Sequence, residues 1–205
     1  MQTNGSQTGT FSLAISHDSK NKINRGILWA VDLNAPNGLE QLSTSLRSAR
    51  DLIEYPLLVS TMFLNNKMES VGHKIQDSKD TLVAIEDKTG IRRDDLDEDE
   101  ADFERLELGK VTRILTSLIS KLVHNKYNCQ LQQSMISFLQ ETNACHNYSN
   151  SLGKGEETKR VVEERLSYFR SWVQFNELRA AYLTERADSQ KQTVSMVPEV
   201  RCCGI

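Results

Sequence analysis

The sequence predicts a mainly α-helical protein, a long-helix bundle or coiled-coil-like body with a small N-terminal β-hairpin head. Only three prolines and ten glycines occur among the 205 residues, so long stretches are free of helix breakers. Apolar residues recur at alternating spacings of three and four over most of the chain, which is the period of one helix face. Two short segments near the N-terminus are instead rich in β-branched and aromatic residues, which is typical of strands.

The elements are expected in the following order. Residues 1–9 hold nothing to bury and form a disordered lead. TFSLAIS (10–16) and RGILWAVDL (25–33) are strands joined by the polar turn HDSKNKIN, within a hairpin head over residues 10–36. This head must pack on the helices, because two strands alone are marginal in water. Residues 37–196 form the long-helix bundle, and residues 197–205 form an unstructured tail.

Four helical stretches are expected in the bundle. Pro56 separates a helix over about 37–53 from one over about 57–89, which Gly90 is placed to cap. An acidic loop at about 91–101 leads to a third helix over about 102–147, whose second half mixes Asn, Gln and His into its apolar stripe. This mixture predicts partial exposure or a break near Asn125. A loop at about 149–157 precedes the last helix. The seam of the second helix consists of Leu64, Met68, Val71, Ile75, Ser78, Leu82 and Ile85.

The last helix has the most regular apolar seam of the chain. A helix that covers this seam is on the order of 50 Å or longer, which favours an extended bundle or coiled coil. We therefore expect self-association or a helical protein partner through this helix, and an oligomer that Leu183→Asp disrupts. Asn176 and Gln190 either fix register or oligomeric state, or lie at the edge of the seam. The predicted oligomerisation residues are the seam residues other than Gln190, namely Val162, Leu166, Phe169, Val173, Asn176, Ala180, Leu183, Ala187 and Val194.

The composition excludes several functional classes. With 38% hydrophobic residues, 26% charged residues and a net charge of −3, the chain has no general attraction to nucleic acid or to anionic membranes. The longest apolar run, residues 55–64, is about half of what a bilayer requires, so we expect no transmembrane segment. The four cysteines form no C-x-x-C pair, and the N-terminus lacks a secretory pattern, so we expect a cytoplasmic setting.

No motif indicates catalysis, a cofactor or a metal. Asp95, Asp97 and Asp99 have EF-hand spacing, but Glu100 and Leu106 stand where the loop requires glycine and glutamate. The Ser-x-x-Lys matches and the Gly-Lys-Gly at 153–155 lack their companion residues. The four histidines share no metal-binding spacing. We therefore expect a protein that is not an enzyme and that has no cofactor.

The terminal Cys-Cys-Gly-Ile has the outline of a prenylation box with Cys202 as acceptor. Glycine occupies a slot that is normally aliphatic, and no polybasic stretch supplies a second membrane signal. An unstructured end with ordinary thiols is therefore favoured, and a lipid-anchored peripheral membrane adaptor that uses Cys202 stays open as an alternative. Membrane contact would otherwise require a membrane-bound partner.

Two parts of the sequence resemble a known family. FSLAISHDSKNKINRGILWAVDL, a short helix and SARDLIEYPLLVSTMFLNNKMESVGHKIQDSKDTLVAIEDKTGI together look like the soluble part of a fungal family of CorA-like proteins. Those proteins place a hairpin ahead of a Pro-Leu-Leu helix that ends in a Glu-x-x-Thr-Gly type of cap. WVQFNELRAAYLTERADSQKQTV is similar to the long stalk helix of that family, which leads toward two transmembrane helices.

The resemblance covers about residues 11–194. CorA-type transporters conduct magnesium and related divalent cations through a pore near a Gly-Met-Asn signature, and this sequence has neither the signature nor a membrane segment. The resemblance implies the cytosolic helical domain alone, whose place in the family is oligomerisation and cation-sensitive gating. The last seam runs to Val194 and meets Pro198 without a cap, so we expect that a continuation toward the membrane has been lost. An accessory protein or enzyme of a fungal pathway stays open as a further alternative.

Overall fold

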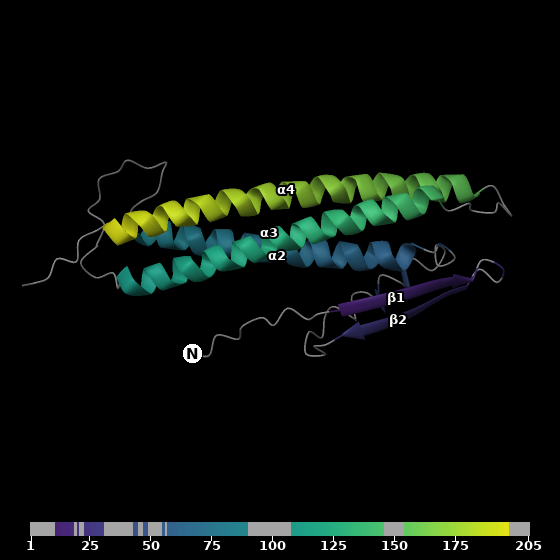
Figure 1. Cartoon of the computed structure of the whole chain (residues 1–205), viewed down its shortest axis with the longest axis horizontal. Helices are drawn as coiled ribbons and strands as arrows, with labels where there is room; N and C mark the ends of the chain where they lie inside the picture. Colours follow the sequence, from purple (N-terminus) through teal and green to yellow (C-terminus); the bar gives the residue numbers. More distant parts are fainter. Residues whose placement is uncertain are drawn as a thin grey trace, which may run out of the picture. The chain divides into compact units, whose positions relative to one another are not determined.

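The computed structural model describes residues 11–18, 20, 23–30, 43–44, 47–48, 55, 57–89, 108–145 and 154–196. Most of these residues lie in long helices, so the predicted mainly α class is confirmed (Figure 1). The predicted lead at 1–9, the acidic loop at 91–101 and the tail at 197–205 lie outside the described residues. Most of the predicted first helix, 37–53, also lies outside them.

Two strands pair near the N-terminus. β1 (Phe11–Asp18) and β2 (Ile23–Ala30) are antiparallel, and Asp18 faces Ile23 across the pair. The expected turn at 17–24 is therefore too long, because residues 17, 18, 23 and 24 belong to the strands. The backbone N–H of Lys20 donates to Oδ1 of Asp18 over 3.0 Å, and such bonds favour a tight reversal of the chain.

The first long helix, α2 (Leu58–Thr89), begins and ends close to the predicted positions. At its start the hydroxyl of Thr61 donates to the carbonyl oxygens of Leu57 and Leu58. At its end the hydroxyl of Thr89 donates to the carbonyl oxygen of Ile85 over 3.0 Å, which satisfies one of the acceptors that a helix end leaves open. Every residue of its predicted seam is buried.

The next helix, α3 (Leu108–Cys145), is continuous. The predicted break or partial exposure near Asn125 is wrong, because Asn125 is 3% exposed and the helix runs through it. A buried amide is tolerated in a helix seam where its polar atoms find partners. The buried seam of α3 continues over its second half through Asn125, Cys129, Gln132, Ile136, Leu139 and Asn143.

The last helix, α4 (Lys154–Met196), has 43 residues, which corresponds to about 65 Å. It begins inside the loop expected at 149–157. Glu156 and Glu157 fall in its first turn, where carboxylates are favoured by the positive end of the helix dipole. The composition of this stretch is therefore typical of a helix start as well as of a loop.

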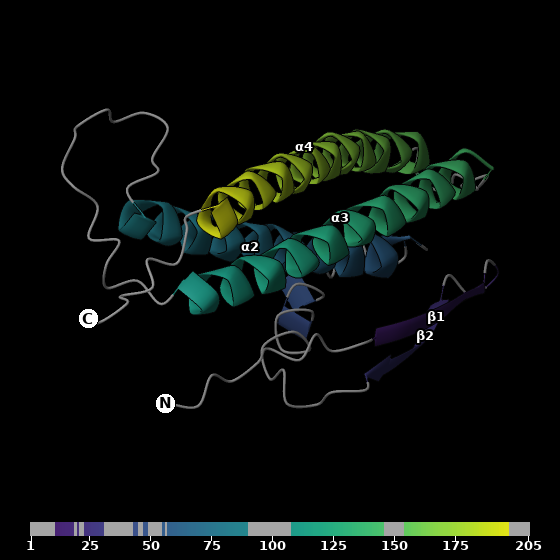
Figure 2. The same cartoon turned by 60° about the vertical axis from the view of Figure 1, so that its left-hand side comes forward.

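The chain divides into two compact units, and each helix contributes to both. Unit 1 comprises Met1–Met68 and Met135–Phe169, and unit 2 comprises Glu69–Ser134 and Arg170–Ile205. The division crosses the helices, whereas the sequence suggests a head over 10–36 and a bundle over 37–196. Within unit 2 the segments of α2 and α4 run in the same direction and α3 runs opposite to them, as Figures 1 and 2 both show.

Unit 1 contains a buried polar network that joins its helices. The hydroxyl of Tyr55 donates to Oδ1 of Asn143 on α3 over 2.6 Å. Nδ2 of Asn143 donates to the carbonyl oxygen of Lys159 on α4 over 3.4 Å, and Nζ of Lys159 donates to the carbonyl oxygen of Ala144 over 3.3 Å. These bonds satisfy the Asn143 amide inside the core, which explains how the seam of α3 accommodates it.

Candidate functional site

The predicted oligomerisation seam of α4 is buried inside the chain. Its least buried member, Val162, is only 8% exposed, and Leu183 is 2% exposed. The helices of the same chain cover this face, so it offers no surface to a second copy. Self-association stays a prediction, and it requires a different surface. The buried seam consists of Val162, Leu166, Phe169, Val173, Asn176, Ala180, Leu183, Ala187, Gln190 and Val194.

The two polar residues of this seam are not at an exposed edge. Asn176 is 3% exposed and Gln190 is 7% exposed, so the edge interpretation is wrong. Nδ2 of Asn176 donates to the carbonyl oxygen of Trp172 over 3.1 Å, one turn earlier in the same helix. This bond satisfies part of the amide within α4 itself.

The cysteines show no reactive or metal-binding arrangement among the described residues. Cys129 is fully buried on α3. Burial and, to a smaller extent, the nearby carboxylate of Glu177 together raise the pKa of its thiol to about 11. The thiol therefore stays protonated at neutral pH, which makes it a poor nucleophile. The part of the chain that the structure describes contains no group of three His, Cys, Asp or Glu side chains that could hold a metal ion. Cys202 lies outside that part.

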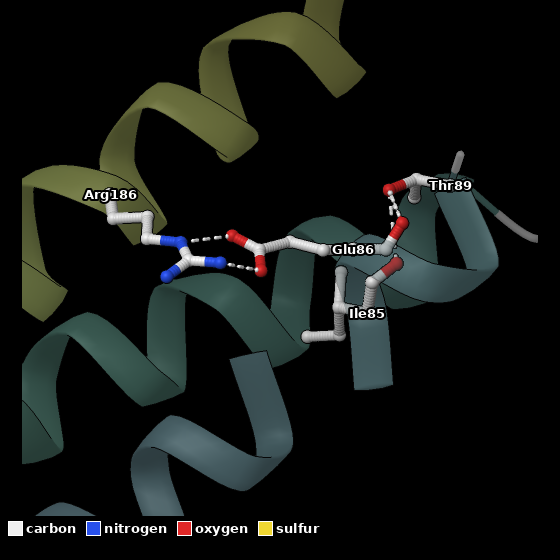
Figure 3. A network of polar contacts seen from close by, with 4 residues as sticks. All are labelled: Ile85, Glu86, Thr89 and Arg186. Atoms are coloured by element: carbon white, nitrogen blue, oxygen red, sulfur yellow. Dashed lines mark hydrogen bonds and ion pairs between the residues drawn. The ribbon is translucent and has the colours of Figure 1, made fainter. Parts of the chain in front are cut away.

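An ion pair in unit 2 joins α2 to α4, as Figure 3 shows. Glu86 is 1% exposed, and its carboxylate receives two hydrogen bonds from the guanidinium of Arg186. Nε of Arg186 lies 2.6 Å from Oε1 of Glu86. The hydrogen bond to Glu86 raises the pKa of Arg186 above its ordinary value. This geometry pairs both carboxylate oxygens, which is the condition for holding a carboxylate inside a core.

Further polar contacts join α4 to both of its neighbouring helices in unit 2. The guanidinium of Arg179 donates to the side-chain carbonyl of Gln76 on α2. On the α3 side, Nε2 of Gln130 and Nε2 of Gln133 donate to the two carboxylate oxygens of Glu177, over 2.9 Å and 2.6 Å. The contacts to both helices orient α4 about its own axis. These contacts therefore also determine which side of α4 is left exposed.

Gly72 on α2 leaves space for the indole ring of Trp172 on α4. A Cβ atom built on Gly72 would lie 2.7 Å from Cη2 of Trp172 and 3.1 Å from Cζ2. Both distances are shorter than carbon atoms in contact adopt. The absence of a side chain at Gly72 therefore lets Trp172 pack directly against the backbone of α2.

We expect Gly72→Ala to lower the free energy of unfolding by about 1 kcal/mol. The alanine gains about 1 kcal/mol of helix propensity, but displacing the indole costs about 1–3 kcal/mol. Chemical denaturation followed by circular dichroism measures the net change. Gly109→Ala is the matched control on α3, because nothing lies within 4 Å of its added methyl group. That control should leave stability unchanged or raise it, and an equal loss in both variants would contradict the packing explanation.

Two helices of unit 2 each carry a stripe of exposed apolar residues, and we call these two stripes together the outer face. It consists of Val123, Tyr127 and Leu131 on α3 and of Phe175, Leu178 and Tyr182 on α4, which are between 50% and 72% exposed. On each helix these residues follow one another at spacings of three or four, so each set lies along one helix face. Large apolar side chains that gather on a protein surface are typical of interaction sites.

The two halves of the outer face differ in charge. From Leu108 to Ser134, α3 contains Lys110, Arg113, Lys121 and Lys126 and no acidic residue. Over the region of Phe175 to Tyr182, α4 is flanked by charges of both signs, Arg170 before it and Glu185 and Asp188 after it. All three of these flanking side chains are exposed. The α3 half is therefore cationic, whereas the α4 half carries charges of both signs.

The chain matches no family model, no curated protein and no solved structure. Among the described helices, none combines the length and the apolar character that crossing a membrane requires.

The sequence contained a signal for the outer face. Phe175, Leu178 and Tyr182 form a second apolar stripe on the last helix, opposite its seam. Periodicity predicts one buried seam for each helix, whereas a helix with two apolar stripes has a second apolar surface to cover. The pair of Glu86 and Arg186 carried no comparable signal, because its members are 100 residues apart.

Proposed function

We propose that this chain is a non-enzymatic helical interaction protein, and that the outer face of unit 2 is its binding surface. One observation supports the proposal above all. The seam of α4 is closed inside the chain, while Phe175, Leu178 and Tyr182 remain 52–72% exposed on the same helix. Leaving large apolar side chains in water is costly, so a face that keeps them together favours a bound partner.

The resemblance to the cytosolic domain of CorA-like proteins supports the same class of function. In that family the domain serves oligomerisation and gating, and neither role requires catalytic residues. We propose on this basis that the chain belongs to that fungal family and acts in the cytoplasm. The paired hairpin strands and the long α4 are consistent with the segments that carry the resemblance.

The proposal predicts that contacts to other molecules form at the outer face. A photo-reactive phenylalanine analogue placed at Tyr127 or at Tyr182 should crosslink into discrete protein bands in cells that express the chain. The same analogue at Asp80, an exposed position on α2, is the control. Because apolar contacts form the core of protein interfaces, we expect at least about tenfold more crosslinked product at the outer face.

A second measurement tests that the bands depend on the apolar surface. Leu131→Glu and Leu178→Glu, each combined with the probe on the other helix, should remove the bands while the melting temperature stays within a few degrees, because both side chains are exposed. Equal crosslinking at Tyr127, Tyr182 and Asp80 would overturn the proposed function.

A further inference from the structure

We draw no further inference here: the strongest candidate, the exposed apolar stripe of Phe175, Leu178 and Tyr182 on α4, carries none, because nothing in the structure shows what covers it.

Discussion

Replacing Arg186 with methionine is expected to lower the free energy of unfolding by about 3 kcal/mol, because it leaves the Glu86 carboxylate buried without its counter-charge. Methionine fills a similar volume on α4, so the loss reports the missing guanidinium more than missing packing. Urea denaturation of wild type and variant under the same conditions measures the difference.

Two further variants distinguish the stabilising effect of the buried charge pair from that of a hydrogen bond alone. Arg179→Met removes a hydrogen bond to the neutral side chain of Gln76, so it should cost only about 1 kcal/mol. The double variant Glu86→Leu/Arg186→Met removes both charges together and should recover most of the loss, since an apolar pair of similar volume often replaces a buried ion pair without cost. If Arg186→Met and Arg179→Met cost the same, the ion pair is not the reason for the loss.

Leu183→Asp is expected to unfold the chain. Leu183 is 2% exposed, and the substitution removes its packing and places a carboxylate in the core of unit 2. Together these effects cost about 5 kcal/mol or more, which approaches the total stability of an ordinary domain. Circular dichroism at low micromolar concentration should show a lost or strongly lowered thermal transition.

Leu178→Asp is the matched variant on the same helix, five residues earlier and on the outer face. Leu178 is 72% exposed, so the melting temperature should change by only a few degrees. Light scattering at high concentration should nevertheless show that self-association is weakened. If Leu178→Asp unfolds the chain and Leu183→Asp leaves its stability unchanged, the assignment of buried and outer faces is wrong.

Periodicity alone was sufficient to predict the inner faces of the helices. The seams of α2 and α4 were predicted from their spacings of three and four, and each of their residues is buried. The spacing was sufficient there because nearly all of those positions are apolar. On α3 the stripe contains Asn125, Gln132 and Asn143, and hydrophobicity cannot show that a distant hydroxyl such as that of Tyr55 satisfies an amide.

The outer face was harder to predict, because it is the surface that stays exposed after the helices of the same chain have packed together. The seam of α4 looked suitable for a second copy because the sequence does not show which helices of the same chain cover it. Only the arrangement of the helices in unit 2 shows that Leu183 is enclosed and Leu178 exposed. The packing of Trp172 on Gly72 likewise depends on helix positions that no local pattern specifies.

The contribution of α4 to both units has a consequence for synthesis on the ribosome. The chain emerges from its N-terminus, so α2 and α3 are made before the residues of α4 that complete each core. The pairs that join α2 to α4 span about 100 residues, and such distant contacts form late. Until about residue 194 has left the ribosome, the apolar seams of α2 and α3 lack one of their covering helices. The nascent protein therefore exposes apolar surface during that period, which puts it at risk of aggregation.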